Sequence, residues 1–190
     1  MALTKLNYTG QGTIPIASIP TITAAKMPTG SVIQTVHNTP SSTTHITLAS
    51  SPPNMIEFSS TLRTSITPLF SNSKLRLTFT GLVGGRNSGA IISMKFYDNT
   101  NNSNVGFSSL GTGSSRTFAN LSIRTVDADA NDRHLQTMQA YQNASNTNAR
   151  TYSIYGMIEA GQTMDLNMTT TDNAGCSYVP FVFTIEEIAG

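Results

Sequence analysis

The stretch Ser65–Val83, SITPLFSNSKLRLTFTGLV, decides the fold. After a turn at 68–73, apolar and polar side chains alternate along 74–83, and a side-chain period of two indicates a pleated strand with one buried face. The segment before the turn carries apolar residues on one face as well. The stretch therefore predicts an antiparallel pair of strands from a β-sandwich. The expected buried positions are Phe58, Leu62 and Ile66 before the turn and Leu75, Leu77, Phe79 and Val83 after it.

Short alternating segments recur through the rest of the chain, separated by turn residues at intervals of 8 to 12 residues. This spacing predicts an all-β fold, an antiparallel β-sandwich (jelly roll) of about ten strands over 29–190. Only 128–142 is ambiguous, because Leu135 and Met138 also fit helical spacing; a strand is expected at 133–141. The expected core includes Leu75, Leu77, Phe79, Ile92, Met94, Ile154, Phe181 and Phe183.

Residues 1–28 differ from the sandwich, since prolines and glycines interrupt a scatter of large apolar side chains. Proline at this density excludes a helix and a central strand. We expect an extended N-terminal arm that inserts into a partner subunit, with an arm folded back over its own sandwich as the alternative. The expected anchoring residues are Leu3, Leu6, Tyr8, Ile14, Ile16, Ile19 and Ile22.

Composition excludes several classes of partner. Charged residues are 11% of the chain, against roughly 25% in an average globular domain. The net charge of +1 gives no electrostatic footprint for nucleic acid, and no apolar run approaches the roughly 18 residues of a membrane span. The single cysteine, Cys176, excludes an intrachain disulfide. The N-terminus lacks the pattern of a signal peptide, so synthesis in a host cytoplasm is expected.

No motif predicts catalysis, a metal or a cofactor. The cluster Asp127, Asp129 and Asp132 has the spacing of an EF-hand start, but Asp132 replaces the required glycine and Met138 the closing glutamate, so a solvated turn is favoured over a cation site. The adjacent Glu186 and Glu187 must face opposite sides of a strand and form no acid/base pair. The sequence therefore predicts a non-enzymatic protein without a cofactor. The three histidines lack metal-ligand spacing: His37, His45 and His134.

Three segments resemble a family of small virion proteins from marine and cyanobacterial tailed phages. They are PTGSVIQ at 28–34, SITPLFSNSK at 65–74 and the terminal IEEIAG at 185–190. Lys95-Phe96-Tyr97-Asp98 stands where the family carries an arginine-aspartate strand, and Tyr97 departs from that pattern. The resemblance runs in order over 28–190. It implies a jelly roll, a homotrimer and a place on the particle exterior, with no cofactor and no catalytic residues.

Three functions follow from the resemblance and the residues. The leading one is an exterior capsid decoration (cement or head-fibre) protein, anchored to other virion proteins by its arm. The second is a tail fibre or receptor-binding tip that holds a host-surface glycan or receptor through loops 98–104, 111–117 and 143–148. An enzyme acting on surface polysaccharide is the most remote. The absence of tryptophan and the few rings in these loops favour decoration.

Overall fold

A computed structural model describes residues 27–39, 46–48, 54–85, 91–106, 119–124, 133–159, 162–166 and 181–190. Within these ranges the regular secondary structure is β-strand, apart from one 3₁₀-helix at Ser60–Leu62. The strands are β1 (Val32–Asn38), β2 (Ile46–Leu48), β3 (Ile56–Glu57), β4 (Thr64–Ile66), β5 (Lys74–Gly85), β6 (Ile91–Asp98), β7 (Ser103–Asn104), β8 (Leu121–Arg124), β9 (Arg133–Asn143), β10 (Arg150–Ile158), β11 (Met164–Leu166) and β12 (Val182–Ile188).

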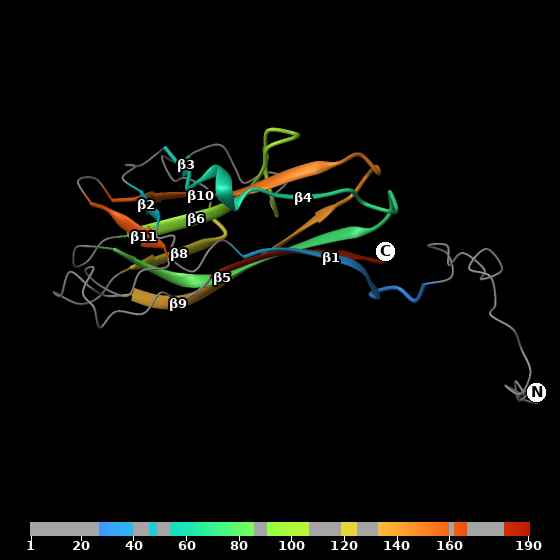
Figure 1. The fold of residues 1–190 in the computed structure, drawn as a ribbon, viewed down its shortest axis with the longest axis horizontal. Helices are drawn as coiled ribbons and strands as arrows, with labels where there is room; N and C mark the ends of the chain where they lie inside the picture. Colours follow the sequence, from blue (N-terminus) through green and yellow to red (C-terminus); the bar gives the residue numbers. More distant parts are fainter. Residues whose placement is uncertain are drawn as a thin grey trace, which may run out of the picture.

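The strands form two sheets that pack face to face, as Figure 1 shows. In the first, which we name the β5 sheet, β9 pairs with one edge of β5, while β12 and β11 share the other edge. Strand β1 lies outside β12, and β2 lies outside β11. In the second, the β10 sheet, β6 pairs with one edge of β10, and β3 and β4 share the other. The far edge of β6 carries β7 and β8.

Eight of these strands pair in a nested order. Strand β1 pairs with β12, β4 with β10, β5 with β9, and β6 with β8, all antiparallel. Among these eight, the first in sequence pairs with the last, the second with the seventh, and so on inward. This nesting places four strands in each of two sheets, as in a jelly roll. The predicted antiparallel β-sandwich is therefore confirmed, with jelly-roll topology.

The turn at 68–73 does not close a hairpin, and the predicted pairing of 57–66 with 74–83 is wrong. Ile66 of β4 pairs with Arg150 in the β10 sheet, whereas Lys74 of β5 pairs with Asn143 and Ile188 in the β5 sheet. The turn therefore carries the chain across the sandwich. Alternation along a strand identifies its buried face but does not determine which strand it pairs with, because every strand offers the same backbone hydrogen-bonding groups.

The segment before the turn is also less regular than its sequence suggested. Phe58, Leu62 and Ile66 are buried as expected, but they do not lie on one continuous strand. Ser59 accepts a hydrogen bond from the backbone amide of Thr61 (3.2 Å) and so caps the 3₁₀-helix between β3 and β4. Apolar residues at every fourth position fit this broken path as well as they fit one continuous strand.

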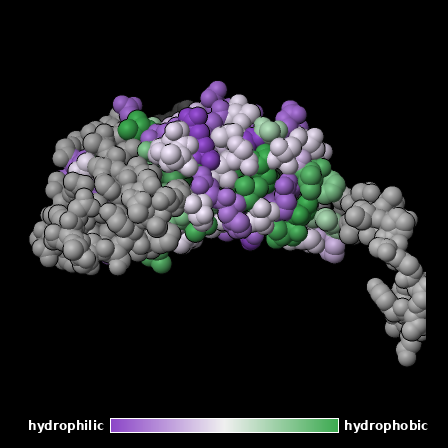
Figure 2. All heavy atoms as spheres, in the orientation of Figure 1, coloured by the Kyte–Doolittle hydropathy of each residue, from purple (hydrophilic) through white to green (hydrophobic). Residues whose placement is uncertain are grey.

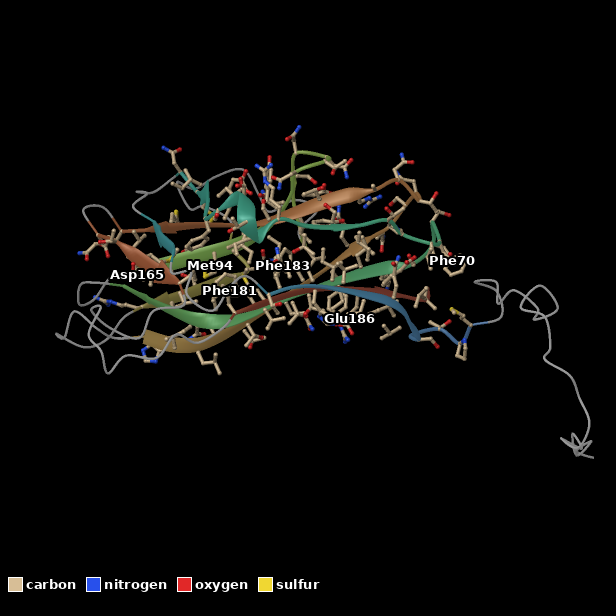
Figure 3. The ribbon with its side chains drawn as sticks, in the orientation of Figure 1. Phe70, Met94, Asp165, Phe181, Phe183 and Glu186 are labelled. Carbon is tan, nitrogen blue, oxygen red and sulfur yellow. The ribbon has the colours of Figure 1, made fainter. Side chains whose placement is uncertain are left out.

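The core lies between the two sheets. All eight expected core residues are buried, and Figure 3 shows Met94, Phe181 and Phe183 pointing into the space between the layers. Phe96 of β6 stacks on Phe183 of β12 with ring centroids 5.4 Å apart, which joins the sheets directly. Gly81 of β5 makes room for a second ring contact, between Phe79 and Phe181, because a β-carbon at Gly81 would lie 2.7 Å from Cβ of Phe181.

Candidate functional site

The residues expected to anchor the arm lie outside the described ranges: Leu3, Leu6, Tyr8, Ile14, Ile16, Ile19 and Ile22. The aspartates at 127, 129 and 132, Cys176 and the loop 111–117 lie outside them too. What the structure does show is the point where the chain enters the sandwich. The amide of Gly30 donates to the carbonyl of Ala189 (2.9 Å), and the amide of Ala189 donates to the carbonyl of Ser31 (2.8 Å). The described chain therefore enters the sandwich at 30–31, beside Ala189.

A buried glutamate organises this end of the molecule. Glu187 of β12 is fully buried, and its carboxylate receives donors from two separate segments, β1 and the 68–73 turn. We call the surrounding segments, 30–34, 67–73 and 187–190, the arm-base junction. The donors to the carboxylate are Gln34 Nε2 (2.6 Å), the backbone amides of Leu69 (2.9 Å) and Phe70 (2.9 Å), and Ser73 Oγ (2.6 Å).

The charge of Glu187 is stabilised by neutral groups. Burial alone raises the pKa of a carboxyl group, because it favours the uncharged acid. Here the hydrogen bonds from the Leu69 amide and the Ser73 hydroxyl, with those from Gln34 and Phe70, outweigh burial, and the pKa of Glu187 lies below its ordinary 4.5. None of the ion pairs among the described residues includes Glu187. The carboxylate therefore works as a multiple hydrogen-bond acceptor that ties β1 and the 68–73 turn to β12.

The junction brings together the three segments that resemble the phage proteins. Gly30 has a φ of +90°, which only glycine adopts without strain, and this bend starts the bonds to Ala189. Gln34 and Ser73 both reach Glu187. At the end of the chain, a β-carbon on Gly190 would overlap the backbone of the 68–73 turn. The sequence motifs thus have a common structural cause.

The neighbouring Glu186 behaves differently, as strand alternation predicted. It points away from the sandwich in Figure 3 and accepts a hydrogen bond from Arg76 Nε (2.6 Å). This hydrogen bond raises the pKa of Arg76. The two adjacent carboxylates therefore lie in different environments: Glu187 is buried, and Glu186 is on the outer face of the β5 sheet.

A second buried carboxylate lies across the same end of the sandwich. Asp98, at the end of β6, accepts hydrogen bonds from the amides of Thr100 (3.0 Å) and Asn101 (3.0 Å), and from Asn101 Nδ2 (2.7 Å). It also accepts from Gln142 Nε2 of β9 (3.1 Å), so it links the two sheets. Asn102 in the same turn has a φ of 50°. The turn after β6 is thus held from inside by one side chain.

A pocket opens beside this link. It has a volume of about 700 Å³ and lies where the end of β9 meets the β6–β7 hairpin. Two of the loops expected to contact a receptor, 98–104 and 143–148, contribute to it. No local motif marks the pocket, because its residues come from three distant segments. They are Lys74, Ser103, Asn104, Gly106, Tyr141, Gln142 and Asn143.

The outer face of the β10 sheet carries a third polar cluster. The rings of Tyr97 and Tyr155 lie 4.6 Å apart, and Lys95 Nζ is 5.5 Å from the first centroid and 5.8 Å from the second. Partial burial lowers the pKa of Lys95. Beside the rings, Arg63 Nε donates to Glu57 Oε1 (2.7 Å). The charged groups of this cluster therefore interact within it, Lys95 with the two rings and Arg63 with Glu57.

Large hydrophobic side chains are exposed in several places rather than in one band. Figure 2 shows hydrophobic patches scattered among hydrophilic and intermediate residues on the visible face. Ile91 is 47% exposed and Val182 is half-buried, so apolar side chains on the outer faces of β6 and β12 reach the surface. Val32 and Leu69, both about half exposed, belong to the arm-base junction. The others are Ile56, Leu135 and Tyr141.

Among the described residues, no group of three or more His, Cys, Asp or Glu side chains could hold a metal ion. In the same ranges, no helix is long and apolar enough to cross a membrane.

Comparisons with known proteins place the chain near no established family. No family model matches the sequence, and no curated protein does. Among solved structures, one of the infectious bursal disease virus Gx strain matches with a TM-score of 0.37 and 9% identity over 83% of this chain and 43% of that one. A VP2 subviral particle of the same virus matches with a TM-score of 0.37 and 8% identity, over 84% and 38%. The chain thus spans about two fifths of these structures, and likeness at this level carries no argument about function.

Proposed function

We propose that the chain is a non-enzymatic structural protein of a tailed-phage virion. Its place is the outside of the capsid, as a decoration protein of the cement or head-fibre type. Residues 1–28 form the anchoring arm, and residues 29–190 the jelly roll. The arm attaches to other virion proteins, and the sandwich assembles as a homotrimer.

The arm-base junction is the observation that carries this proposal. The resemblance to phage virion proteins rests on three short segments, and all three meet around Glu187, where residues 28–31 enter the sandwich. A set of residues that shapes the base of an arm is expected where the arm bears load. Val32 and Leu69 give the junction exposed apolar surface. The jelly roll agrees with this role but does not define it, since one fold hosts many functions.

Deleting residues 1–28 tests the anchor. The described sandwich has a continuous core without these residues, so the deletion variant is expected to fold with nearly the same melting temperature. It is expected to lose binding to particles that lack the protein, because each isoleucine buried in a partner contributes about 1.5–3 kcal/mol. Binding at full affinity without the arm contradicts the anchor. A variant that does not fold shows instead that the arm is part of the sandwich.

The homotrimer has its own test. Light scattering of the full-length protein at micromolar concentration is expected to give three times the mass of one chain. A single-chain mass under these conditions contradicts the homotrimer but does not test the anchoring role of the arm. Position on the particle is tested by electron microscopy of intact virions with an antibody against the sandwich, where labelled capsids are expected.

A tail fibre or receptor-binding tip is the second candidate. The pocket between the β6–β7 hairpin and β9 favours it, because two of the loops expected to contact a receptor meet there. Antibody labelling confined to the tail would replace the first candidate with this one.

A further inference from the structure

The pocket beside Asp98 has the size of a ligand site. Pockets for small molecules measure roughly 300–1,000 Å³, and this one has about 700 Å³. It lies on the open side of the sandwich, where β9 pairs only with β5 among the described strands. The register of β5 and β9 forms one wall of the pocket, because it places Lys74 of β5 opposite Asn143 of β9. Tyr141 stands two residues before Asn143, on the same face of the strand.

The walls of the pocket are fixed before any ligand arrives. Gln142 is held by its bond to the buried Asp98, which also holds the turn that leads to Ser103 and Asn104. Gly106, on the other wall, has a φ of +89°, and a β-carbon there would lie 3.1 Å from Cβ of Ala140. A preformed site loses little conformational entropy on binding, which favours recognition of a small ligand.

The chemistry of the lining is that of a sugar site. Three amide side chains and the hydroxyls of Ser103 and Tyr141 line the pocket, and each of these groups both donates and accepts hydrogen bonds, as the hydroxyls of a saccharide do. Tyr141 is 49% exposed, and its hydroxyl donates to Gln139 Oε1 (3.3 Å), which restrains the ring. An aromatic ring provides an apolar surface with a polar edge, suited to the C–H face of a pyranose.

The charge of the residues that line the pocket restricts the chemical class of the ligand further. Among the described residues that line the pocket, Lys74 is the only charged one, and it belongs to neither of the ion pairs in the same ranges. The nearest carboxylate in the lining's own network, Asp98, is fully buried and already accepts four hydrogen bonds. An anionic group on the ligand therefore meets an exposed ammonium, and none of the described residues that line the pocket is acidic.

We propose that this pocket binds a saccharide unit that carries a carboxylate. The carboxylate contacts Lys74, the ring lies against Tyr141, and the hydroxyls bond to Ser103, Asn104 and Asn143. This site goes beyond the proposed function, because it holds on whichever surface of the virion the protein stands.

Saturation-transfer NMR on the full-length protein tests the site, with methyl glucuronide and a methyl sialoside as probes. Methyl glucoside tests the need for the carboxylate, and acetate tests whether the carboxylate alone suffices. Transfer to the ring protons of both acidic sugars is expected, with much weaker transfer to the glucoside and none to acetate. Equal signals from glucuronide and glucoside, or no signal from either acidic sugar, would overturn the proposal.

Three variants locate the binding. Lys74→Gln is expected to weaken binding of the acidic sugars about tenfold and to leave the glucoside unchanged. Tyr141→Ala is expected to weaken all sugars. Lys95→Gln removes the same charge from the outer face of the β10 sheet and serves as the matched control, with unchanged affinity expected. If Lys95→Gln abolishes binding while Lys74→Gln does not, the site is the tyrosine pair of the other sheet and this assignment is wrong. Urea denaturation of each variant verifies that it is folded.

Discussion

Two buried carboxylates, Glu187 and Asp98, hold opposite sides of the same end of the sandwich, and they do so with similar bonds. Each accepts two backbone amides from a turn and a side-chain amide from a strand of a different segment. Around Glu187 the segments close on one another, and Gly190 packs against the turn. Beside Asp98 the partner Gln142 lines an open pocket. The same chemistry thus builds a closed junction on one side and the wall of a binding site on the other.

Glu187→Gln is the change with the largest expected effect. The amide keeps the size of the side chain but replaces one acceptor oxygen with a donor, which then faces backbone amides, Gln34 or Ser73. Buried donors left without acceptors, together with the lost charge, are expected to lower the free energy of unfolding by about 3 kcal/mol. Urea denaturation at neutral pH measures this. A loss below 1 kcal/mol would show that the junction is not held by its carboxylate.

The next effect is the pH dependence of stability. Because folding lowers the pKa of Glu187, its contribution is complete above the unfolded value of 4.5 and is lost as the pH falls through the folded pKa. Wild-type stability is therefore expected to fall with acidification below 4.5 more steeply than that of Glu187→Gln, which has no proton to take up at this site. Parallel curves for the two proteins would contradict this assignment.

Asp98→Asn is expected to cost less, about 2 kcal/mol. The remaining oxygen still accepts from the amides of Thr100 and Asn101, while the new amide group faces Asn101 Nδ2 and Gln142 Nε2. Because this frees Gln142, the variant is also expected to bind acidic sugars more weakly, whereas Glu187→Gln keeps wild-type affinity. Both variants are compared by urea denaturation and by the same NMR titration. If Asp98→Asn and Glu187→Gln bind the acidic sugars equally well, the proposed difference between the pocket side and the arm-base junction is wrong.

Glu186→Gln is the smallest of these changes. It breaks only the bond to Arg76 on the outer face, and partly exposed ion pairs contribute about 0–1 kcal/mol. Its charge change equals that of Glu187→Gln, one residue further along the chain, so it is the matched control for position. A loss as large as that of Glu187→Gln would mean that net charge, rather than burial, sets the effect.

Much of the fold was predictable because the alternation of apolar and polar side chains along a strand shows which of its faces is buried. It identified the buried faces of β5, β6, β10 and β12, and the same alternation places Glu187 in line with Phe183 and Ile185 on the inner face. That signal could have revealed the inward position of the carboxylate. Alternation alone does not predict such a carboxylate, because a charged residue at an inward position is stable only with donors from other segments, here Gln34, Leu69, Phe70 and Ser73.

The parts that were not predictable depend on long-range pairing. The connection through 68–73 looked like a hairpin because both flanking segments alternate, and nothing in either segment says that they join different sheets. The pocket is formed by residues near 74, 104 and 142, which only the pairing of β5 with β9 and the bond from Asp98 to Gln142 bring together.

The arm-base junction also determines how the molecule transmits force. A pull on the residues before Met27 reaches the sandwich through the two backbone bonds between 30–31 and Ala189. If these yield, Gln34 passes the load to Glu187, and through it to the turn at 68–73, which connects the two sheets. Tension that would otherwise peel one edge strand is thus shared among three segments and both layers. A sandwich tethered at this point resists shear as a unit.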